Sequence, residues 1–501
     1  MSETPDPKEN SYGRILKSTT LVGGSQVMNI LLGIVRTKFL AMLLGPAGIG
    51  MIGLYTGVMN TIGVFAGMGI GSSGVRQIAK AAGSDDKERI ARTIITMRRA
   101  AFVSGALGML LTAVFCVPIS KLTFGNEEHA ISFVLLSVTL FLGAISAGQV
   151  ALVQGLRRIV DLASLSVLGS LLGTVISIPM IFFLGKGGII PFLVTVSATN
   201  LLTSWWYTRK IPVMRVVLGL KETIHEARSL LSLGFVFMTT GLITTAVMYA
   251  IQVVVARQLG MNDVGLYQAA STLSNIYIGV ILNAMGMDFY PRLTSVAEDS
   301  DVCNRMVNEQ TEMGLLVAIP GILATLTFTP LVIQIFYSPS FIPAYEVLRW
   351  QILGVFLRVV AWPMGFILLA KGRGKIFFCT EITSNTVYLA LVWAALKYFG
   401  LVGTGMAFFA LYIFYTVMMF AVVRRLSGFQ WSSANLRVIG IASVGVALVF
   451  MLPSVASENE ALAAGCFLTL ISLVFSFRSL NKLVGPFWIT CFKSKPKSRL
   501  L

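Results

Sequence analysis

Apolar runs separated by short charged or glycine- and proline-containing breaks occupy almost the whole chain. A helix needs about 20 apolar residues to cross a membrane, and most of these runs are at least that long. Such runs between turn-forming residues indicate membrane-spanning helices joined by short loops. The pattern predicts about fourteen spans, over residues 15–44, 48–78, 99–122, 130–155, 159–184, 187–210, 229–259, 263–291, 306–336, 345–370, 374–398, 401–425, 436–453 and 461–480.

Composition indicates the same class of protein. Of the 501 residues, 55% are hydrophobic and only 12% are charged, whereas soluble chains carry about a quarter charged residues. The chain has too little polar surface to face water on all sides, so lipid must surround most of it. We therefore expect an all-α polytopic membrane protein.

The net charge of +17 would indicate nucleic-acid binding in a soluble protein. If the N-terminus is cytosolic, however, nearly all Lys and Arg of the loops fall on the cytosolic side. Only Lys121, Lys186 and Lys397 fall on the opposite side. This asymmetry follows the positive-inside rule. It predicts that both termini are cytosolic, and it explains the charge without nucleic acid.

Motifs for catalysis, metals or cofactors are missing from the sequence. The five cysteines form no C-x-x-C pair, and the two histidines, His129 and His225, lie far apart, which argues against a metal site. The glycine-rich run 67–71 has no predicted strand before it, so close helix packing or a hinge is favoured over nucleotide binding. We expect no catalytic residue, no metal and no cofactor.

A basic segment follows the second predicted span. Residues 85–99 place Ile90, Ile94 and Met97 at helical spacing among charged residues. One interpretation is an amphipathic helix on the anionic inner leaflet. The other is a loop that carries positive-inside charge.

A weak internal repeat is visible. Lys38 precedes a glycine-bounded turn at 45–48, and Arg257 precedes another at 260–265. Because six predicted helices separate the copies, the repeat is parallel, as in transporters built from two like lobes. We expect a tail at 1–14, a six-helix lobe at 15–228, a second at 229–428, and two extra helices with a basic tail at 429–501.

Charged residues inside the first span are candidates for function, since a cation at the bilayer centre costs about 2.5–3.5 kcal/mol. Arg36 and Lys38 are about 200° apart around their helix, and Asn29 shares the face of Arg36. This span contains no Asp or Glu. A cavity of positive sign suits an anionic substrate better than a cationic drug.

Later spans carry further polar candidates. Arg358 lies deep in its span, with Gln351 and Trp362 on its own face. A second span carries a polar stripe, and a third carries an acid about two turns from its start; these residues are Gln268, Ser271, Asn275 and Glu381.

Structural alternatives remain open for three of the charged residues. Arg349 can pair with Glu346, three residues earlier, and we then expect it to contribute little to transport. Arg257 can extend to the lipid headgroups. Glu381 can pair with the basic residues that precede its helix.

Several short motifs occur in the order found in one family. The segment 44–50, LGPAGIG, and the pattern Trp350-Gln351-x-x-Gly354, followed by Ala370-Lys371 and Glu381, resemble bacterial O-antigen and enterobacterial-common-antigen flippases of the Wzx type. These flippases belong to the multidrug/oligosaccharidyl-lipid/polysaccharide (MOP) exporter superfamily. Val355 departs from the pattern, because the family often has Asp there.

The resemblance implies two six-helix lobes around a central cavity and a substrate of oligosaccharide on undecaprenyl diphosphate. Lys38, Arg257 and Arg358 occupy basic positions of the family, and with Arg36 they form the predicted cationic cavity. The predicted cavity-polar or coupling residues are Asn29, Gln268, Ser271, Asn275, Gln351, Trp362, Lys371 and Glu381.

We therefore expect a flippase of the bacterial cytoplasmic (inner) membrane that moves repeat units for O-antigen or a related polysaccharide, and not an enzyme. Membrane lipids, a polysaccharide polymerase and a chain-length regulator are the expected partners, and H⁺ or Na⁺ is the candidate coupling ion. A cation-coupled multidrug or small-solute antiporter is the first alternative, which the missing acid in the first span disfavours. A glycan polymerase or ligase is the second, which the short outward loops disfavour.

Overall fold

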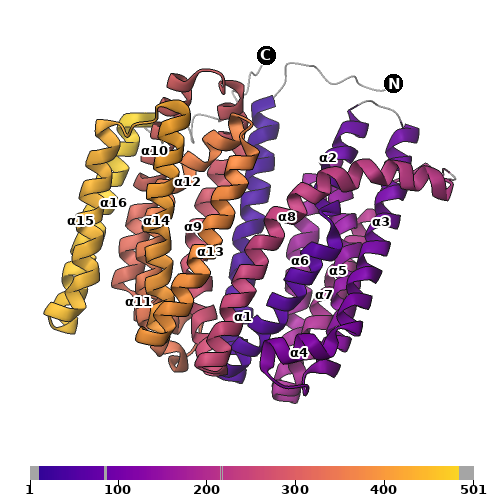
Figure 1. The fold of residues 1–501 in the computed structure, drawn as a ribbon, viewed down its shortest axis with the longest axis horizontal. Coiled ribbons are helices and arrows are strands. Elements are labelled where there is room, and N and C mark those ends of the chain that lie inside the picture. Colours follow the sequence, from indigo (N-terminus) through magenta and orange to yellow (C-terminus); the bar gives the residue numbers. More distant parts are fainter. Residues whose placement is uncertain (1–10, 84–86, 215, 217, 485–501) are drawn as a thin grey trace, which may run out of the picture. The chain divides into compact units, whose positions relative to one another are not determined.

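The computed structural model describes residues 11–83, 87–214, 216 and 218–484, drawn as a ribbon in Figure 1. Helices and turns account for the regular structure of this part of the chain, which contains no strand. Residues 1–10 of the predicted N-terminal tail and residues 485–501 of the predicted basic C-terminal tail lie outside it. The expected all-α class is confirmed.

Short connections join the helices along the chain. In order they are α1 (Ser11–Gly67), α2 (Ile70–Ala82), α3 (Lys87–Val114), α4 (Cys116–Phe124), α5 (Ala130–Gly155), α6 (Ile159–Leu184), the 3₁₀ turn η1 (Gly185–Gly188), α7 (Ile189–Thr208), α8 (Leu220–Gln258), α9 (Met261–Ser295), α10 (Ser300–Thr327), α11 (Thr329–Phe336), η2 (Pro339–Ala344), α12 (Tyr345–Ala370), α13 (Gly374–Phe399), α14 (Val402–Ser427), α15 (Ser433–Val455) and α16 (Glu458–Val484).

The number of membrane spans agrees with the sequence. Among the described residues, 11 helical stretches are long and apolar enough to cross a membrane. Two of these stretches contain two predicted spans each. Gly23–Gly67 bends at Gly45, and Ile159–Thr208 contains α6 and α7 on either side of η1. With α9, which has 35 residues, every predicted span has a helix, and the expectation of about fourteen is confirmed.

The chain forms two compact units. The first ends at Gly265 and includes Phe336–Ser338, and the second holds the remaining residues. Helix α8 contacts α1, α2, α3 and α4, so it lies in the first unit in this structure, whereas the predicted lobe boundary at 228 assigns it to the second. The division into lobes at 228 and 428 stays a prediction.

The turn predicted after residue 44 is a sharp bend inside α1. Gly45 has φ 66° and ψ −172°, a conformation that residues with a side chain rarely adopt. Pro46 follows, and a proline disfavours the helical conformation of the residue before it. The sequence Gly45-Pro46 therefore turns the chain between two membrane spans.

The two copies of the repeated turn contact each other within the first unit. A Cβ atom at Gly50 would overlap the carbonyl oxygen of Met261, and a Cβ atom at Gly265 would overlap that of Pro46. The contacts are reciprocal, since the same offset separates Pro46 from Met261 and Gly50 from Gly265. Parallel repeats related by a twofold axis give this pattern, so it supports the repeat.

The glycine-rich run 67–71 breaks the helix between α1 and α2. Met68 and Gly69 both have positive φ, 46° and 64°, and a Cβ atom at Gly69 would overlap the backbone of Gly234 in α8. The interpretation as close packing is confirmed.

The described part of the basic segment, from Lys87 on, is helical, so the loop interpretation was wrong, and the helix is not separate from the span that follows. From Lys87 it forms the first turns of α3. Ile94 and Met97 are buried in a cluster with Ile78 of α2 and Leu152 of α5. A helix with one apolar face satisfies the same pattern when it packs on protein as when it packs on lipid.

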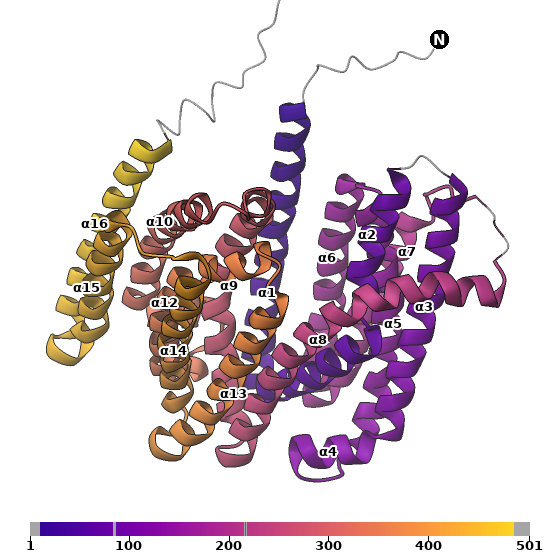
Figure 2. The same cartoon turned by 45° about the horizontal axis from the view of Figure 1, so that its top comes forward.

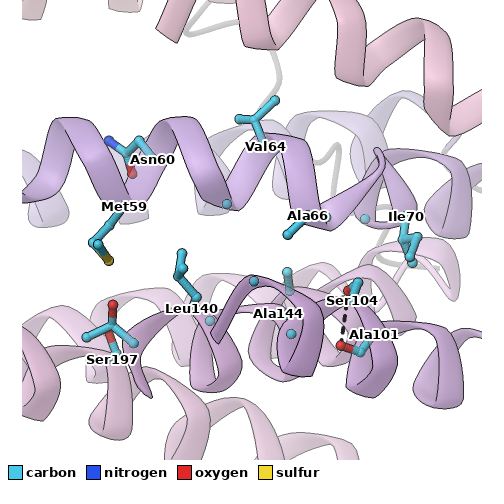
Figure 3. Close-up of a pocket in the computed structure, with 18 of the residues that line it drawn as sticks. Met59, Asn60, Val64, Ala66, Ile70, Ala101, Ser104, Leu140, Ala144 and Ser197 are labelled. Atoms are coloured by element: carbon cyan, nitrogen blue, oxygen red, sulfur yellow. Dashed lines mark hydrogen bonds between the residues drawn. The ribbon is translucent and has the colours of Figure 1, made fainter. Parts of the chain in front are cut away.

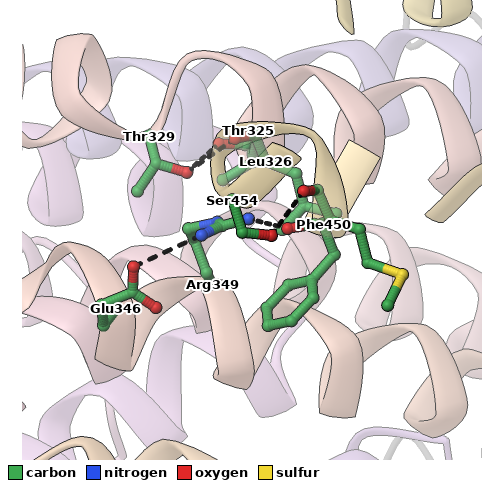
Figure 4. Close-up of polar contacts among 8 residues, drawn as sticks. Thr325, Leu326, Thr329, Glu346, Arg349, Phe450 and Ser454 are labelled. Atoms are coloured by element: carbon green, nitrogen blue, oxygen red, sulfur yellow. Dashed lines mark hydrogen bonds and ion pairs between the residues drawn. The ribbon is translucent and has the colours of Figure 1, made fainter. Parts of the chain in front are cut away.

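Arg349 ties α12 to the helix pair α15–α16, whose two helices lie side by side (Figure 2). Its Nη1 lies 3.3 Å from Oε1 of Glu346, which confirms the predicted ion pair. Its Nη2 donates to the carbonyl oxygen of Phe450 in α15 (Figure 4). Arg349 is only 5% exposed, so it is a packing residue of this region.

Candidate functional site

The second unit contains a polar network that joins α9 to α12. Arg358 of α12 donates from Nη1 to Oδ1 of Asn275 at 2.7 Å. Asn275 donates from Nδ2 to the carbonyl oxygen of Ser271, one turn earlier, at 2.8 Å. Two residues predicted from separate helices are therefore in direct contact, and both belong to the predicted cavity set.

Gln351 extends this network towards the start of α12. It is buried and donates from Nε2 to the hydroxyl oxygen of Ser271 at 3.1 Å. Its Oε1 accepts from the hydroxyl of Ser274, also at 3.1 Å. Ser274 is not among the predicted residues, although it lies three residues after Ser271 and so within one turn of the predicted stripe.

A carboxylate, Glu381 of α13, lies near this network. Its Oε1 accepts a hydrogen bond from the hydroxyl of Tyr415 in α14 at 3.1 Å, and its carboxylate interacts electrostatically with the guanidinium of Arg358. The alternative of a local ion pair with the preceding basic residues has no support among the described residues. The network thus spans α9, α12, α13 and α14.

Three predicted residues of the second unit make other contacts. The ring of Trp362 packs against Phe366, with centroids 4.6 Å apart, and against Gly286 of α9. Lys371 donates from Nζ to the carbonyl oxygen of Ala297 at 2.8 Å and to the hydroxyl of Ser300 at 3.0 Å. Gln268 is half-buried on α9, one turn before Ser271.

In the first unit, Asn29, Arg36 and Lys38 all lie on α1 and are half-buried. Asn29 donates from Nδ2 to the hydroxyl oxygen of Ser166 in α6 at 2.7 Å. Arg36 has no hydrogen bond or ion pair with any other described residue. A guanidinium without a partner inside a membrane span is costly unless it meets water or an anion.

Arg257 stabilises the end of α4. Its Nη2 donates to the carbonyl oxygens of Lys121 and, at 2.9 Å, Leu122. The last carbonyls of a helix lack partners within the helix and attract cations. Snorkelling to the headgroups, the alternative weighed from the sequence, is therefore not the contact that this structure shows.

Two cavities open inside the first unit, and neither is lined by a charged residue. The cavity in Figure 3 has a volume of about 580 Å³ and is lined mainly by small and apolar residues, with Asn60, Ser104 and Ser197 among the exceptions. The other has a volume of about 630 Å³ and is lined mainly by hydroxyl and amide side chains. Of its lining, the sequence analysis had singled out only Asn29.

Metal-binding chemistry has no visible basis in the described part of the chain. No group of three or more His, Cys, Asp or Glu residues lies close enough there to hold an ion.

Among the described residues, 11 helical stretches that are long and apolar enough to cross a membrane define a polytopic membrane protein. The chain belongs to the family described as Polysaccharide biosynthesis protein, whose sequence profile matches residues 39–346.

Two relatives match over most of their length. The chain is 24% identical over 415 residues to the Lipid III flippase of Escherichia coli strain K12, a match that covers 80% of this chain and 96% of that protein. It is 23% identical over 384 residues to a Putative O-antigen transporter of Shigella flexneri, covering 75% and 90% of the two chains. The resemblance read from the short motifs is confirmed.

Solved structures show the same fold. The lipid II flippase MurJ in an inward closed conformation aligns with a TM-score of 0.68 at 13% identity, over 93% of this chain and 99% of that one. An inward-facing multidrug resistance transporter of the MATE family, in the MOP superfamily, aligns with a TM-score of 0.64 at 17% identity, over 80% and 94%. The chain therefore has the fold of the MOP superfamily.

Proposed function

We propose that this protein is a flippase for undecaprenyl-diphosphate-linked oligosaccharide, the repeat unit of O-antigen or a related surface polysaccharide. It moves this lipid from the cytoplasmic to the periplasmic leaflet by alternating access, without chemical change. The family and its relatives, which are named as a flippase and an O-antigen transporter, support the proposal. The protein works in the bacterial inner membrane with both termini in the cytosol, as the distribution of Lys and Arg predicts.

One observation favours an anionic substrate for this protein. Three arginines of the predicted cavity make no direct contact with a carboxylate: Arg358 donates to an amide oxygen, Arg257 donates to carbonyl oxygens, and Arg36 has no partner among the described residues. With Lys38 they supply positive charge for a diphosphate. Because phosphate oxygens are strong acceptors for guanidinium groups, these cations lower the barrier to the passage of the head group.

The energetics fit transport outwards. A negative charge that leaves a cell with a negative interior gains about 2.3 kcal/mol per charge per 100 mV. The cations therefore need only lower the barrier, and very tight binding would slow release. Glu381, which accepts a hydrogen bond from Tyr415 and interacts electrostatically with Arg358, is our candidate for coupling to H⁺ or Na⁺.

The polar residues of the network position Arg358. Asn275 accepts a hydrogen bond from Arg358, and Ser271 and Gln351 link the helix of Asn275 to that of Arg358. Gln268, Trp362 and Lys371 have supporting roles in the same unit. On the outer face the flipped lipid would pass to a polysaccharide polymerase and a chain-length regulator, because a single repeat unit must still be assembled into a polymer.

Depletion of the protein in its host tests the function directly. We expect lipid-linked oligosaccharide to accumulate in the inner leaflet, where an impermeant sugar-modifying reagent does not reach it. Re-expression of the wild-type chain should restore access to the reagent. Unchanged lipid-linked pools together with altered drug tolerance would instead favour the antiporter, and loss of polymer with normal flipping would favour a polymerase or ligase.

A further inference from the structure

The hydroxyl-lined cavity of the first unit is unusual for a membrane protein interior. It lies among α1, α5, α6 and α7, and nine of its fifteen lining residues carry a hydroxyl or amide side chain, while none is charged. Its volume of about 630 Å³ lies within the usual range for small-molecule sites, roughly 300–1,000 Å³. Hydroxyl groups of the lining donate to protein carbonyls, as Ser146 does to Asn200 and Ser197 to Leu193. Their oxygens can still accept hydrogen bonds from a polar occupant.

A buried acceptor in this lining lacks a donor. The Oδ1 atom of Asn29 is buried without a hydrogen-bond partner, although the Nδ2 atom of the same side chain donates to Ser166. A buried acceptor that is left without a donor costs the protein about 1–3 kcal/mol of stability. A ligand hydroxyl would donate to this oxygen, whereas a hydrocarbon tail or an anion has no proton to give.

A cation lies on the same face of α1 as the cavity residue Asn29, although it does not line the cavity itself. Asn29 and Arg36 are seven residues apart, so they share a helix face at an axial separation of about 10 Å. Ser25 lies one turn before Asn29 on nearly the same face and also lines the cavity. The face therefore runs from neutral hydrogen-bonding groups to a guanidinium that has no partner among the described residues.

We infer that this cavity is a subsite for the uncharged sugar rings of the substrate, while Arg36 on the same face of α1 receives the diphosphate. The inference rests on the proposed function and adds the place where the glycan is recognised. A sugar ring both donates and accepts through its hydroxyl groups, which matches a lining of hydroxyls and amides. A cationic solute does not match, because the lining has no carboxylate.

Binding measurements on the full chain in nanodiscs test the subsite. The two probes are undecaprenyl diphosphate without sugar and the same lipid diphosphate with a neutral oligosaccharide. We expect the wild-type protein to bind the glycosylated probe about tenfold more tightly, since one or two additional hydrogen bonds give a preference of that order.

Variants separate the sugar subsite from the diphosphate subsite. The double variant Asn29→Leu/Ser166→Ala should bind both probes equally, with its affinity for the sugar-free probe unchanged. Arg36→Gln should weaken the binding of both probes by the same factor. Ser164→Ala is the matched control, because Ser164 lies on the same helix as Ser166, is similarly half-buried and does not line the cavity; it should bind as the wild type does.

The outcomes distinguish this inference from the function on which it rests. Equal affinity of the wild-type protein for the two probes, or a preference that survives in the double variant, overturns the sugar subsite even where export is normal. A wild-type protein that binds neither probe and exports no glycan overturns the proposed function and the subsite together. Should the double variant fold poorly, Ser166→Ala alone removes one hydroxyl group and must reduce the preference.

Discussion

The two units organise their polar groups in different ways. In the second unit, Ser271, Asn275, Gln351 and Arg358 bond to one another across α9 and α12. In the first unit, polar side chains line an open cavity, and Arg36 has no partner among the described residues. A satisfied network fixes the position of a charge, whereas a cavity lining with an unpaired acceptor, the Oδ1 atom of Asn29, is available to a ligand. We therefore assign positioning mainly to the second unit and recognition mainly to the first.

The largest expected effect concerns the backbone contacts of the first unit. Gly50→Ala and Gly265→Ala each introduce a Cβ atom that overlaps a carbonyl oxygen of the opposite turn. We expect a loss of about 1–3 kcal/mol of stability, the usual cost of overpacking, and impaired export, seen as a lower melting temperature of the purified protein and less surface polysaccharide.

Matched glycines on the same two helices serve as controls. A Cβ atom at Gly33 of α1 or at Gly279 of α9 meets nothing within 4 Å. Gly33→Ala and Gly279→Ala should therefore leave the melting temperature unchanged. Normal stability of Gly50→Ala and Gly265→Ala would show that the reciprocal contact is not a constraint on the fold.

Next in size is the effect of Arg358 in the second unit. Arg358→Ala removes a cation from the membrane interior and its hydrogen bond to Asn275. At normal expression we expect export to fall by about tenfold or more, since hydrogen bonds to charged groups are worth about 1.5–3 kcal/mol. Arg358→Lys should keep part of the export because it retains the charge. Full export by a stably inserted Arg358→Ala protein would make this arginine purely structural.

Arg349 offers a test of a buried arginine outside the network. Arg349→Ala breaks a contact between α12 and α15 and leaves the carbonyl oxygen of Phe450 without its side-chain donor. We expect the protein to lose about 1–3 kcal/mol of stability, while export per folded molecule is retained.

The exposed pair of Arg92 and Glu88, 2.7 Å apart, is the control for this substitution. Arg92→Ala should leave the melting temperature unchanged, because exposed ion pairs contribute little. A loss of export by folded Arg349→Ala protein would place this arginine in the transport machinery instead.

The smallest expected effect is a pH dependence in the first unit. His129 lies just before α5, with Nδ1 2.8 Å from the hydroxyl of Tyr55 and its ring 3.9 Å from that of Phe124. Burial lowers the pKa of His129, so the unfolded chain binds a proton more readily than the folded protein. This contribution to stability is therefore fully present above the unfolded pKa of about 6.5 and is lost as the pH falls from there through the lower pKa of the folded protein.

Melting temperatures measured from pH 7 to pH 5 test this sign. The wild-type value should fall more steeply than that of His129→Gln, in which the titrating group is gone. The other histidine, His225, is exposed on α8, so His225→Gln should follow the wild type. If the melting temperatures of the wild type and of His129→Gln fall equally steeply with pH, His129 is not the cause of the pH dependence.

Sequence alone determined the class of fold and part of the site. The length and hydrophobicity of the runs predict the spans because the bilayer sets the length of a helix. Gly45-Pro46 predicts the bend in α1, since few other residues adopt that conformation. Helical spacing placed Ser271 and Asn275 on one face, and the hydrogen bond between them confirms this. The depth of Arg358 in the membrane stays a prediction. The confirmed predictions succeed because they depend on one helix and its solvent.

Only the tertiary structure decided which faces meet. The spacing of Ile94 and Met97 fits a lipid surface and a protein core equally well, and it is the packing of α2 and α5 that buries them. Likewise, the contacts of Arg257 with the end of α4 and of Arg349 with α15 join residues more than a hundred positions apart. The hydroxyl-lined cavity is formed by four helices together. The sequence pattern of one helix does not show which other helices contact it. Several faces of a helix can be equally suitable for packing, and only the packing of the whole chain decides which of them are in contact.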